Sequence, residues 1–153
     1  MRRVAEALYL AAIALWVGGL WVVGYLVVPT LFASLGDRQL AGMVAGKLFA
    51  GMGWVGLAAA AYLAVFLSVR WKRLAPRRSV FWLVLAAGVL LAVGQFGIQP
   101  LMAQMKSDAL PLDVMESAWR ERFVFWHGVS SILYLVQSLL GLWLVVWSER
   151  GLR

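Results

Sequence analysis

Polar side chains recur at helical spacing along the last apolar stretch of this sequence. With about 3.6 residues per turn, they share one face of a helix. Lipid solvates such groups poorly, so a polar face of this kind points into a helix bundle or a wet cavity. The residues on or beside this face that we take as candidate ligand contacts are His127, Ser130, Ser131 and Tyr134.

A second polar stripe lies in the preceding apolar stretch, where Gln95 and Gln99 share one side of a helix. Pro100 beside them removes a helical hydrogen bond and predicts a kink, and Pro29 does the same at a similar depth of the first apolar stretch. Two such kinks either open a small cavity or are bends without function. The first interpretation adds Gln95, Gln99 and Pro29 to the candidate ligand contacts.

Soft metal ions offer another interpretation of the same region. Thioether sulfur binds Cu(I) and similar ions, and imidazole is a common metal ligand. Methionine also fills irregular gaps in a core, so packing is the alternative. The candidate metal ligands are His127, Met43, Met52, Met102 and Met105.

Catalytic signatures are absent from the sequence. It contains no cysteine, no phosphate-binding glycine loop, no nucleophile elbow and no His/Glu pair at metal-binding spacing. With one histidine, a bis-histidine haem would need a second copy of the chain. We therefore expect a protein that is not an enzyme and has no catalytic residue. The sequence requires no cofactor, and a soft metal stays open.

The elements that must position these residues follow from composition. The chain is 63% hydrophobic and 14% charged, against about 45–50% and about 25% in soluble domains. Four uncharged runs each exceed the roughly 20 residues that cross a bilayer as a helix. The sequence predicts an all-α, polytopic membrane protein, one domain over residues 1–153 folded as an antiparallel bundle of four transmembrane helices. The expected spans are approximately 7–33, 48–69, 79–105 and 123–148.

Two of these helices are expected to extend beyond the apolar run at the outer face. Asp37 after Gly36 looks like a helix N-cap, so the second helix is predicted to begin near Arg38. In the same way, Asp113 is predicted to cap a helix that continues through Trp119 into the fourth span.

Small residues predict how the helices pack. Membrane helices associate closely where glycine and alanine recur at helical spacing. Such a row runs along the second helix, and the first helix has a matching one, so we expect these two helices to dock. The predicted packing glycines are Gly18, Gly19, Gly42, Gly46, Gly53 and Gly56.

Charge predicts the orientation. Nine lysines and arginines flank the runs on the side that holds both ends of the chain and the loop 70–78, so the whole net charge of +7 lies there. The positive-inside rule then places both termini in the cytoplasm of a bacterial-type inner membrane, with anionic lipid headgroups as the expected partner. The position of the charge argues against nucleic-acid binding.

Three segments resemble a known family. They read LWVGGLWVVGYLVVPTLF, AGMVAGKLFAGMGWVGL and WHGVSSILYLVQSLLGL, and their motifs are Gly18–Gly19, Pro29 with Phe32, and His127-Gly128-x-Ser130. From about Ala14 to Gly141, the chain resembles the transmembrane protein 205-like family (domain of unknown function 4149). The resemblance implies a small four-helix membrane protein. Because the eukaryotic relatives are linked to resistance to platinum drugs, it also implies handling of soft metals. Many family members carry an asparagine about one turn after the His motif, in the region where this chain has Tyr134.

Three functions of different classes follow. The leading hypothesis is a non-enzymatic membrane protein that binds or passes a small solute or soft metal ion through an outer-facing cavity. The alternative is a structural or assembly subunit, whose glycine seam meets a second copy or another membrane protein. The third is a redox subunit that shares a haem between two copies through His127.

Overall fold

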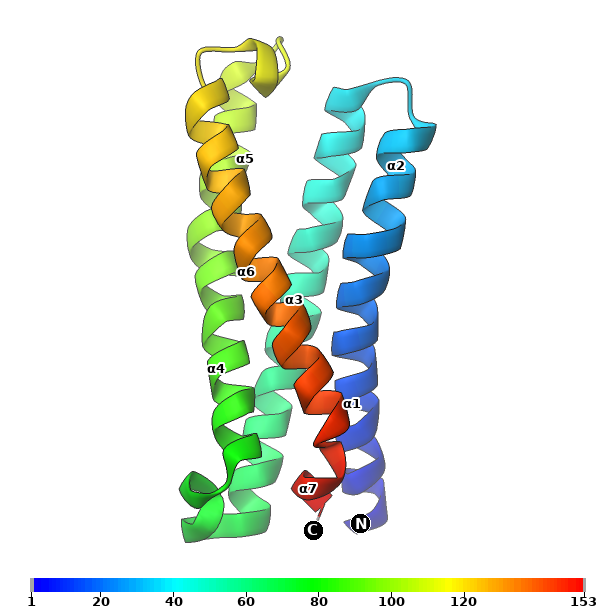
Figure 1. Ribbon diagram of the computed structural model, residues 1–153, viewed down its shortest axis with the longest axis vertical. Helices are drawn as coiled ribbons and strands as arrows, with labels where there is room; N and C mark the ends of the chain where they lie inside the picture. The colour runs from blue at the N-terminus through cyan, green and yellow to red at the C-terminus, as the bar shows by residue number, and fades with distance from the viewer. Residues whose placement is uncertain (1, 153) are drawn as a thin grey trace.

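The computed structural model describes residues 2–152, which are almost entirely helical and contain no strand. Arg153, one of the basic residues counted above, lies outside the described residues. Four helices are long and apolar enough to cross a membrane, which indicates a membrane protein and supports the all-α prediction. They stand side by side along the long axis of the molecule, with both termini at one end (Figure 1). We call this the terminal end and the opposite one the distal end.

The four spans are built from the following elements. The first comprises α1 (Arg2–Val22), η1 (Val23–Val27) and α2 (Val28–Ser34). The second comprises α3 (Arg38–Trp71) and the 3-10 turn η2 (Lys72–Arg77). The third comprises α4 (Ser79–Val93), η3 (Gly94–Ile98) and α5 (Gln99–Ala109). After η4 (Val114–Glu116), the fourth is α6 (Arg120–Val146), and α7 (Ser148–Leu152) closes the chain.

The starts of the second and fourth spans differ. The Asp37 carboxylate accepts hydrogen bonds from the backbone N–H groups of Gln39 and Leu40, so α3 begins at Arg38 as predicted. The prediction of a helix that runs from Asp113 through Trp119 was wrong, because Asp113 caps only the short η4. The Ser117 hydroxyl bonds the local backbone on both sides, donating to the Val114 carbonyl and accepting from the Trp119 N–H, and this competes with a continuous helix.

The prolines of the first and third spans each follow a π-helical turn. The N–H of Val28 bonds to the carbonyl of Val23 just before Pro29, and the N–H of Gln99 bonds to the carbonyl of Gly94 just before Pro100. Proline cannot donate to the helical ladder, and a wider turn is one way to adjust the ladder around it. Both spans therefore continue through their prolines instead of ending there.

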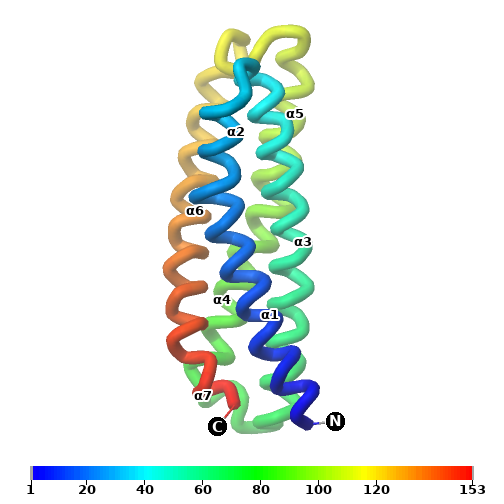
Figure 2. Tube along the Cα trace, turned by 90° about the vertical axis from the view of Figure 1, so that its right-hand side faces the viewer, coloured from blue at the N-terminus to red at the C-terminus, as the bar shows by residue number. Residues whose placement is uncertain are grey.

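The spans form a ring in which α1 packs on α3 and α6, and α4 packs on the same two helices (Figures 1 and 2). The main apolar core lies toward the terminal end and draws on all four. Its fully buried side chains are Tyr9, Leu63, Leu67, Val80, Val84 and Leu144.

Toward the distal end the bundle divides into two arms. One arm consists of α2 and the beginning of α3, and the other of α5, η4 and the beginning of α6, which diverge from the first (Figure 1). The second arm has its own small core of Met105, Ala109, Val114 and Phe123. No residue of η1 or α2 is buried. The polar side chains described next lie between these arms.

Candidate functional site

One side of α3 carries small residues on which side chains from the other spans rest. We call Gly42, Gly46, Gly53 and Gly56 the α3 row. A Cβ built on the first two would come nearest to Lys106, on the third to Gln95, and on the fourth to Leu91 and Trp16. The row therefore lines the inside of the bundle from the distal arms down to the main core.

Lys106 bridges the two arms. Its Nζ donates a hydrogen bond to the Gly42 carbonyl at 2.8 Å and lies 5.6 Å from the centre of the Phe123 ring. Among residues 2–152, no carboxylate lies within ion-pair distance of this ammonium group. An ammonium has three donors, so Lys106 retains capacity to bind an anion or a carbonyl oxygen.

Gln95 occupies the middle of the row. Its side-chain amide donates to the Ala50 carbonyl on α3 at 3.2 Å, which ties the π turn η3 to that helix. Its amide oxygen lies so close to Gly53 that a built Cβ would overlap it. Only glycine at position 53 leaves room for this arrangement.

Tyr134 ties the fourth span to the first. Its hydroxyl donates to the Leu20 carbonyl, and its ring lies edge-on to Phe49 of α3 with centres 5.2 Å apart. Tyr25 continues the connection, because its hydroxyl donates to the Ser138 Oγ at 2.9 Å. Side chains of three spans thus meet beside the α3 row at this level.

The polar region ends at Gly56. A Cβ there would lie 2.8 Å from the Trp16 indole nitrogen and 2.8 Å from Leu91. Trp16 is 3% exposed and belongs to the main core. The α3 row therefore meets the main core at Gly56.

The structure brings together only some of the predicted ligand contacts. Gln95 reaches the α3 row, and Tyr134 lies against Phe49 beside it. His127 is exposed and stacks on Phe123, with ring centres 5.8 Å apart. Ser131 is exposed and donates back to the His127 carbonyl within α6. Pro29 is exposed, and Gln99 and Ser130 are half-buried, on three different spans.

The candidate metal ligands have separate surroundings. Met52 lies against Gly19, where a built Cβ would be 2.5 Å from its methyl group. Met105 is buried in the small core of the second arm, and Met102 packs against it. Met43 is exposed. Across residues 2–152, no three histidine, cysteine or acidic side chains gather at metal-binding distance.

The predicted packing glycines lie on the first span and on the second, and the two groups have different surroundings. The first and second spans pack together, with Gly19 in contact with α3 through Met52. Gly18 is exposed, and nothing lies within 4 Å of where its Cβ would be. The α3 row faces the third span as well as the first, since Lys106, Gln95 and Leu91 all belong to the third.

Three residues of this region were missing from the predicted contacts. The sequence places Lys106 on the same helical stripe as Gln95 and Gln99, so the signal was present although Lys106 was not among the predicted contacts. Tyr25 and Trp16 gave no signal, because single aromatic residues are common in apolar helices. Their roles depend on which neighbour each span faces.

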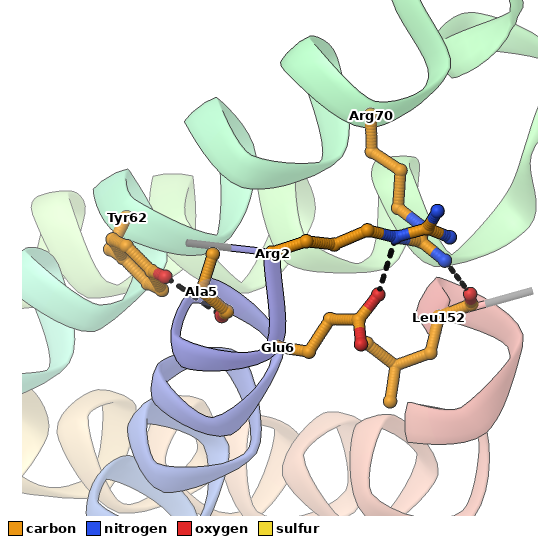
Figure 3. Close-up of polar contacts among 6 residues, drawn as sticks. All are labelled: Arg2, Ala5, Glu6, Tyr62, Arg70 and Leu152. Atoms are coloured by element: carbon orange, nitrogen blue, oxygen red, sulfur yellow. Dashed lines mark hydrogen bonds and ion pairs between the residues drawn. The ribbon is translucent and has the colours of Figure 1, made fainter.

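A second polar group lies at the terminal end, between α1, α3 and α7 (Figure 3). The Glu6 carboxylate accepts from Arg70 at 2.9 Å and from Arg2 at 3.2 Å. Arg70 also donates to the Leu152 carbonyl, and the Tyr62 hydroxyl donates to the Ala5 carbonyl at 3.0 Å. These contacts fasten both ends of the chain to α3.

Comparisons with known proteins identify a family but no individual relative. No curated protein and no solved structure matches the chain. A family model described as a domain of unknown function, DUF4149, matches residues 11–110. The match covers the first three spans, including the α3 row and Lys106, and stops before the His127 motif. Since it covers well over half of the sequence, the chain belongs to the DUF4149 family.

Proposed function

We propose that this protein binds a small anionic or carbonyl-bearing solute between its two distal arms, on the α3 row. The observation that carries the proposal is that Lys106 and Gln95 lie on a row of glycines, with Tyr134 against the neighbouring Phe49 and Trp16 at the inner end of the row. This keeps the sequence-based hypothesis of an outer-facing cavity but replaces His127 with Lys106 as its central charged residue.

The chemistry of the solute follows from the groups that surround the row. Lys106 supplies a positive charge with unused donors at the mouth, and the ring of Phe123 lies beside it. Deeper in the bundle, Gln95 and Tyr134 already donate to backbone carbonyls, so they hold the helices and shape the site. A negative group of the solute would bind at Lys106, and a compact body would rest against Gly42 and Gly46.

The location follows from the distribution of charge. The positive-inside rule assigns the arginine-rich terminal end to the cytoplasm. On this assignment the arms open to the outer side of an inner membrane, and a solute would approach Lys106 from there. Such a protein would bind the solute or take the first step in passing it across.

The methionines support a soft-metal site less well than the row supports a solute. Met52 fills the space beside Gly19, Met105 fills the core of the second arm, and Met43 is exposed. His127 stacks on a ring of its own helix. These placements are those of packing residues.

Single-cysteine labelling tests the proposal, because the natural chain has no cysteine. Gly46→Cys would place a thiol on the α3 row near Lys106, where a built Cβ lies 3.7 Å from Nζ. Gly51→Cys is the matched control on the same helix, exposed and with nothing within 4 Å of its Cβ. In cells, membrane-impermeant thiol reagents added from outside are expected to label position 46 but not the lipid-facing position 51.

Charge selectivity sharpens this test. An anionic methanethiosulfonate should react with Gly46→Cys faster than a cationic one, by on the order of tenfold, because one nearby unit charge acts oppositely on the two reagents. Lys106→Gln in the same background should remove the preference. If Gly46→Cys is as unreactive as Gly51→Cys in every reagent, the arms hold no aqueous site. That result would favour the alternative of an assembly subunit.

A further inference from the structure

The terminal end contains a cavity walled by arginines, at the opposite end of the bundle from the proposed solute site. Its volume is about 240 Å³, and it is lined by Trp71, Arg77, Arg78, Ser79, Val80 and Arg150. The lining combines the α3–α4 connection with α7, parts of the chain about 70 residues apart in sequence that meet at this end (Figure 1). Within residues 2–152, none of the lining residues is acidic.

Two of the three cavity arginines, Arg78 and Arg150, lie over aromatic rings without being neutralised. The Arg78 guanidinium lies 5.2 Å from the centre of the Trp71 ring, and that of Arg150 lies 4.3 Å from the Trp147 ring. Such cation–π contacts orient a guanidinium while leaving its N–H groups free to donate. Within the described residues 2–152, none of the three cavity arginines forms an ion pair with a carboxylate.

The backbone adds donors to the same wall. Helix α4 begins at Ser79, and no side chain caps its N-terminus. The first N–H groups of a helix have no intrahelical acceptor, and the positive end of the helix dipole favours an anion there. Ser79 and Val80, the first two residues of this 15-residue helix, both line the cavity.

Trp71 lies between this cavity and the main core. Its side chain is only 8% exposed, and its indole N–H, itself shielded from open space, has no hydrogen-bond partner within residues 2–152. The ring of Trp71 therefore contributes a rigid wall to the cavity and a surface on which Arg78 stacks.

We infer that this cavity is a binding site for a phosphate group. Three arginines and an uncapped helix N-terminus, gathered around one cavity, form a set of donors suited to phosphate oxygens. The volume is below the roughly 300–1,000 Å³ of pockets that enclose drug-sized ligands, so it admits a headgroup or a small phosphate and not a whole lipid.

A lipid is the source that the surroundings favour. Trp71 also lines a neighbouring groove between α1 and α3, whose wall is largely apolar and includes Tyr62, Val65, Phe66 and Val69. A phospholipid with its phosphate among the arginines would have this groove beside it for an acyl chain. Free phosphate would use the arginine cavity alone, so the two sources can be separated by experiment.

The test compares two double variants that lose equal charge at the same end. Arg77→Gln with Arg150→Gln removes two cavity arginines. Arg3→Gln with Arg73→Gln removes two exposed arginines that line neither cavity. Protein purified in a neutral detergent would be titrated with phosphatidylglycerol, with phosphatidylcholine and with inorganic phosphate. Bound lipid would be counted by native mass spectrometry, and unfolding temperature would be measured for each addition.

We expect phosphatidylglycerol to bind the wild type and the control double variant alike, and the cavity double variant about tenfold more weakly. Stabilisation by inorganic phosphate that is lost in the same variant would show a site for phosphate from either source, whereas a response to the lipid alone would show a headgroup site. Equal losses in the two double variants would overturn the inference, because the arginines would then act only as diffuse surface charge.

A further variant covers the case in which the cavity double variant does not fold. Arg77→Lys with Arg150→Lys keeps the charge but removes the forked donor geometry of arginine. It should bind phosphatidylglycerol more weakly than the control double variant does. Binding equal to that of the control would also overturn the inference.

Discussion

At the terminal end all four spans share one apolar core, whereas at the distal end they separate into two pairs joined mainly by polar side chains. The terminal end is fastened further by the Glu6–Arg70 pair and the bond from Arg70 to Leu152 (Figure 3). Across the distal arms, the Lys106 ammonium group donates a hydrogen bond to the Gly42 carbonyl. The same four helices thus share one core at one end and separate into two arms at the other.

The glycines show what separates the two ends. In lipid, helices associate through close packing and hydrogen bonds, because burial of apolar surface gains little there. At the terminal end, Gly56 and Gly141 let side chains of neighbouring spans lie directly on the backbone. Toward the distal end, Gly42 and Gly46 meet only the tips of Lys106 and Phe32 at 3.7–3.9 Å. The row of small residues is continuous, but only its inner part is used for tight packing.

The largest expected effect compares two alanine substitutions on the α3 row. Gly56→Ala should lower the free energy of unfolding by about 1–3 kcal/mol, because its methyl group would collide with Trp16 and Leu91. Gly46→Ala meets nothing closer than 3.7 Å and should be neutral, or stabilising by up to about 1 kcal/mol through the better helix propensity of alanine. Unfolding in mixed micelles with increasing dodecyl sulfate would measure both.

Gly51→Ala calibrates this comparison, since position 51 is open and reports helix propensity alone. If Gly46→Ala were as damaging as Gly56→Ala, the arms would be packed as tightly as the core. The proposed difference in packing density between the terminal and distal ends would then be contradicted.

A smaller effect is expected at the fastening of the termini. Arg70→Gln should release α7 by removing the hydrogen bond to Leu152, worth about 0.5–1.5 kcal/mol. The pair with Glu6 is partly exposed and should add little. Hydrogen exchange should speed up in α7 and stay unchanged in α5. Arg73→Gln, an exposed arginine at the same end, is the control and should leave both segments unchanged.

The fold was largely predictable because a membrane imposes simple rules. The four uncharged runs gave four helices, and Asp37 gave the start of α3, since length, charge and capping are local properties. The predicted helix after Asp113 failed because Ser117 offers the backbone a competing set of hydrogen bonds. The π turns before Pro29 and Pro100 were not predicted either. A helix can accommodate the hydrogen bond that proline cannot donate either by a kink or by a π turn, and the sequence does not distinguish the two.

The candidate site was less predictable than the fold. A polar face on a helix indicates an inward side, but not which residues of that face are inward. Tyr134 points to Leu20 inside the bundle, while His127, two turns earlier on α6, is exposed because the arms diverge there. The arginine cavity depends on α7 folding back toward the α3–α4 connection. Such a contact between distant segments has no local signal.

The smallest expected effect on stability comes from removing one hydrogen bond between helices at each end of the bundle. Tyr134→Phe removes the hydrogen bond to Leu20 between α6 and α1, and Tyr62→Phe removes the one to Ala5 between α3 and α1. Each should cost about 0.6 kcal/mol, the average for hydrogen bonds between membrane helices. The two losses should therefore be indistinguishable in an unfolding titration.

Distances between spin labels should nevertheless respond at one end only. Labels on Leu26→Cys and Leu135→Cys report on η1 and α6 beside Tyr134. Labels on Leu8→Cys and Val65→Cys report on α1 and α3 near Tyr62, and all four positions are exposed. The first pair should show a broader distribution after Tyr134→Phe, because no residue of η1 is buried and the Tyr25 bond to Ser138 is the other hydrogen bond there. The second pair should be unchanged by Tyr62→Phe, because Tyr9, Leu63 and Leu67 remain packed around it. Equal broadening at both ends would mean that the terminal core does not restrain its helices, and the contrast between core and arms would be lost.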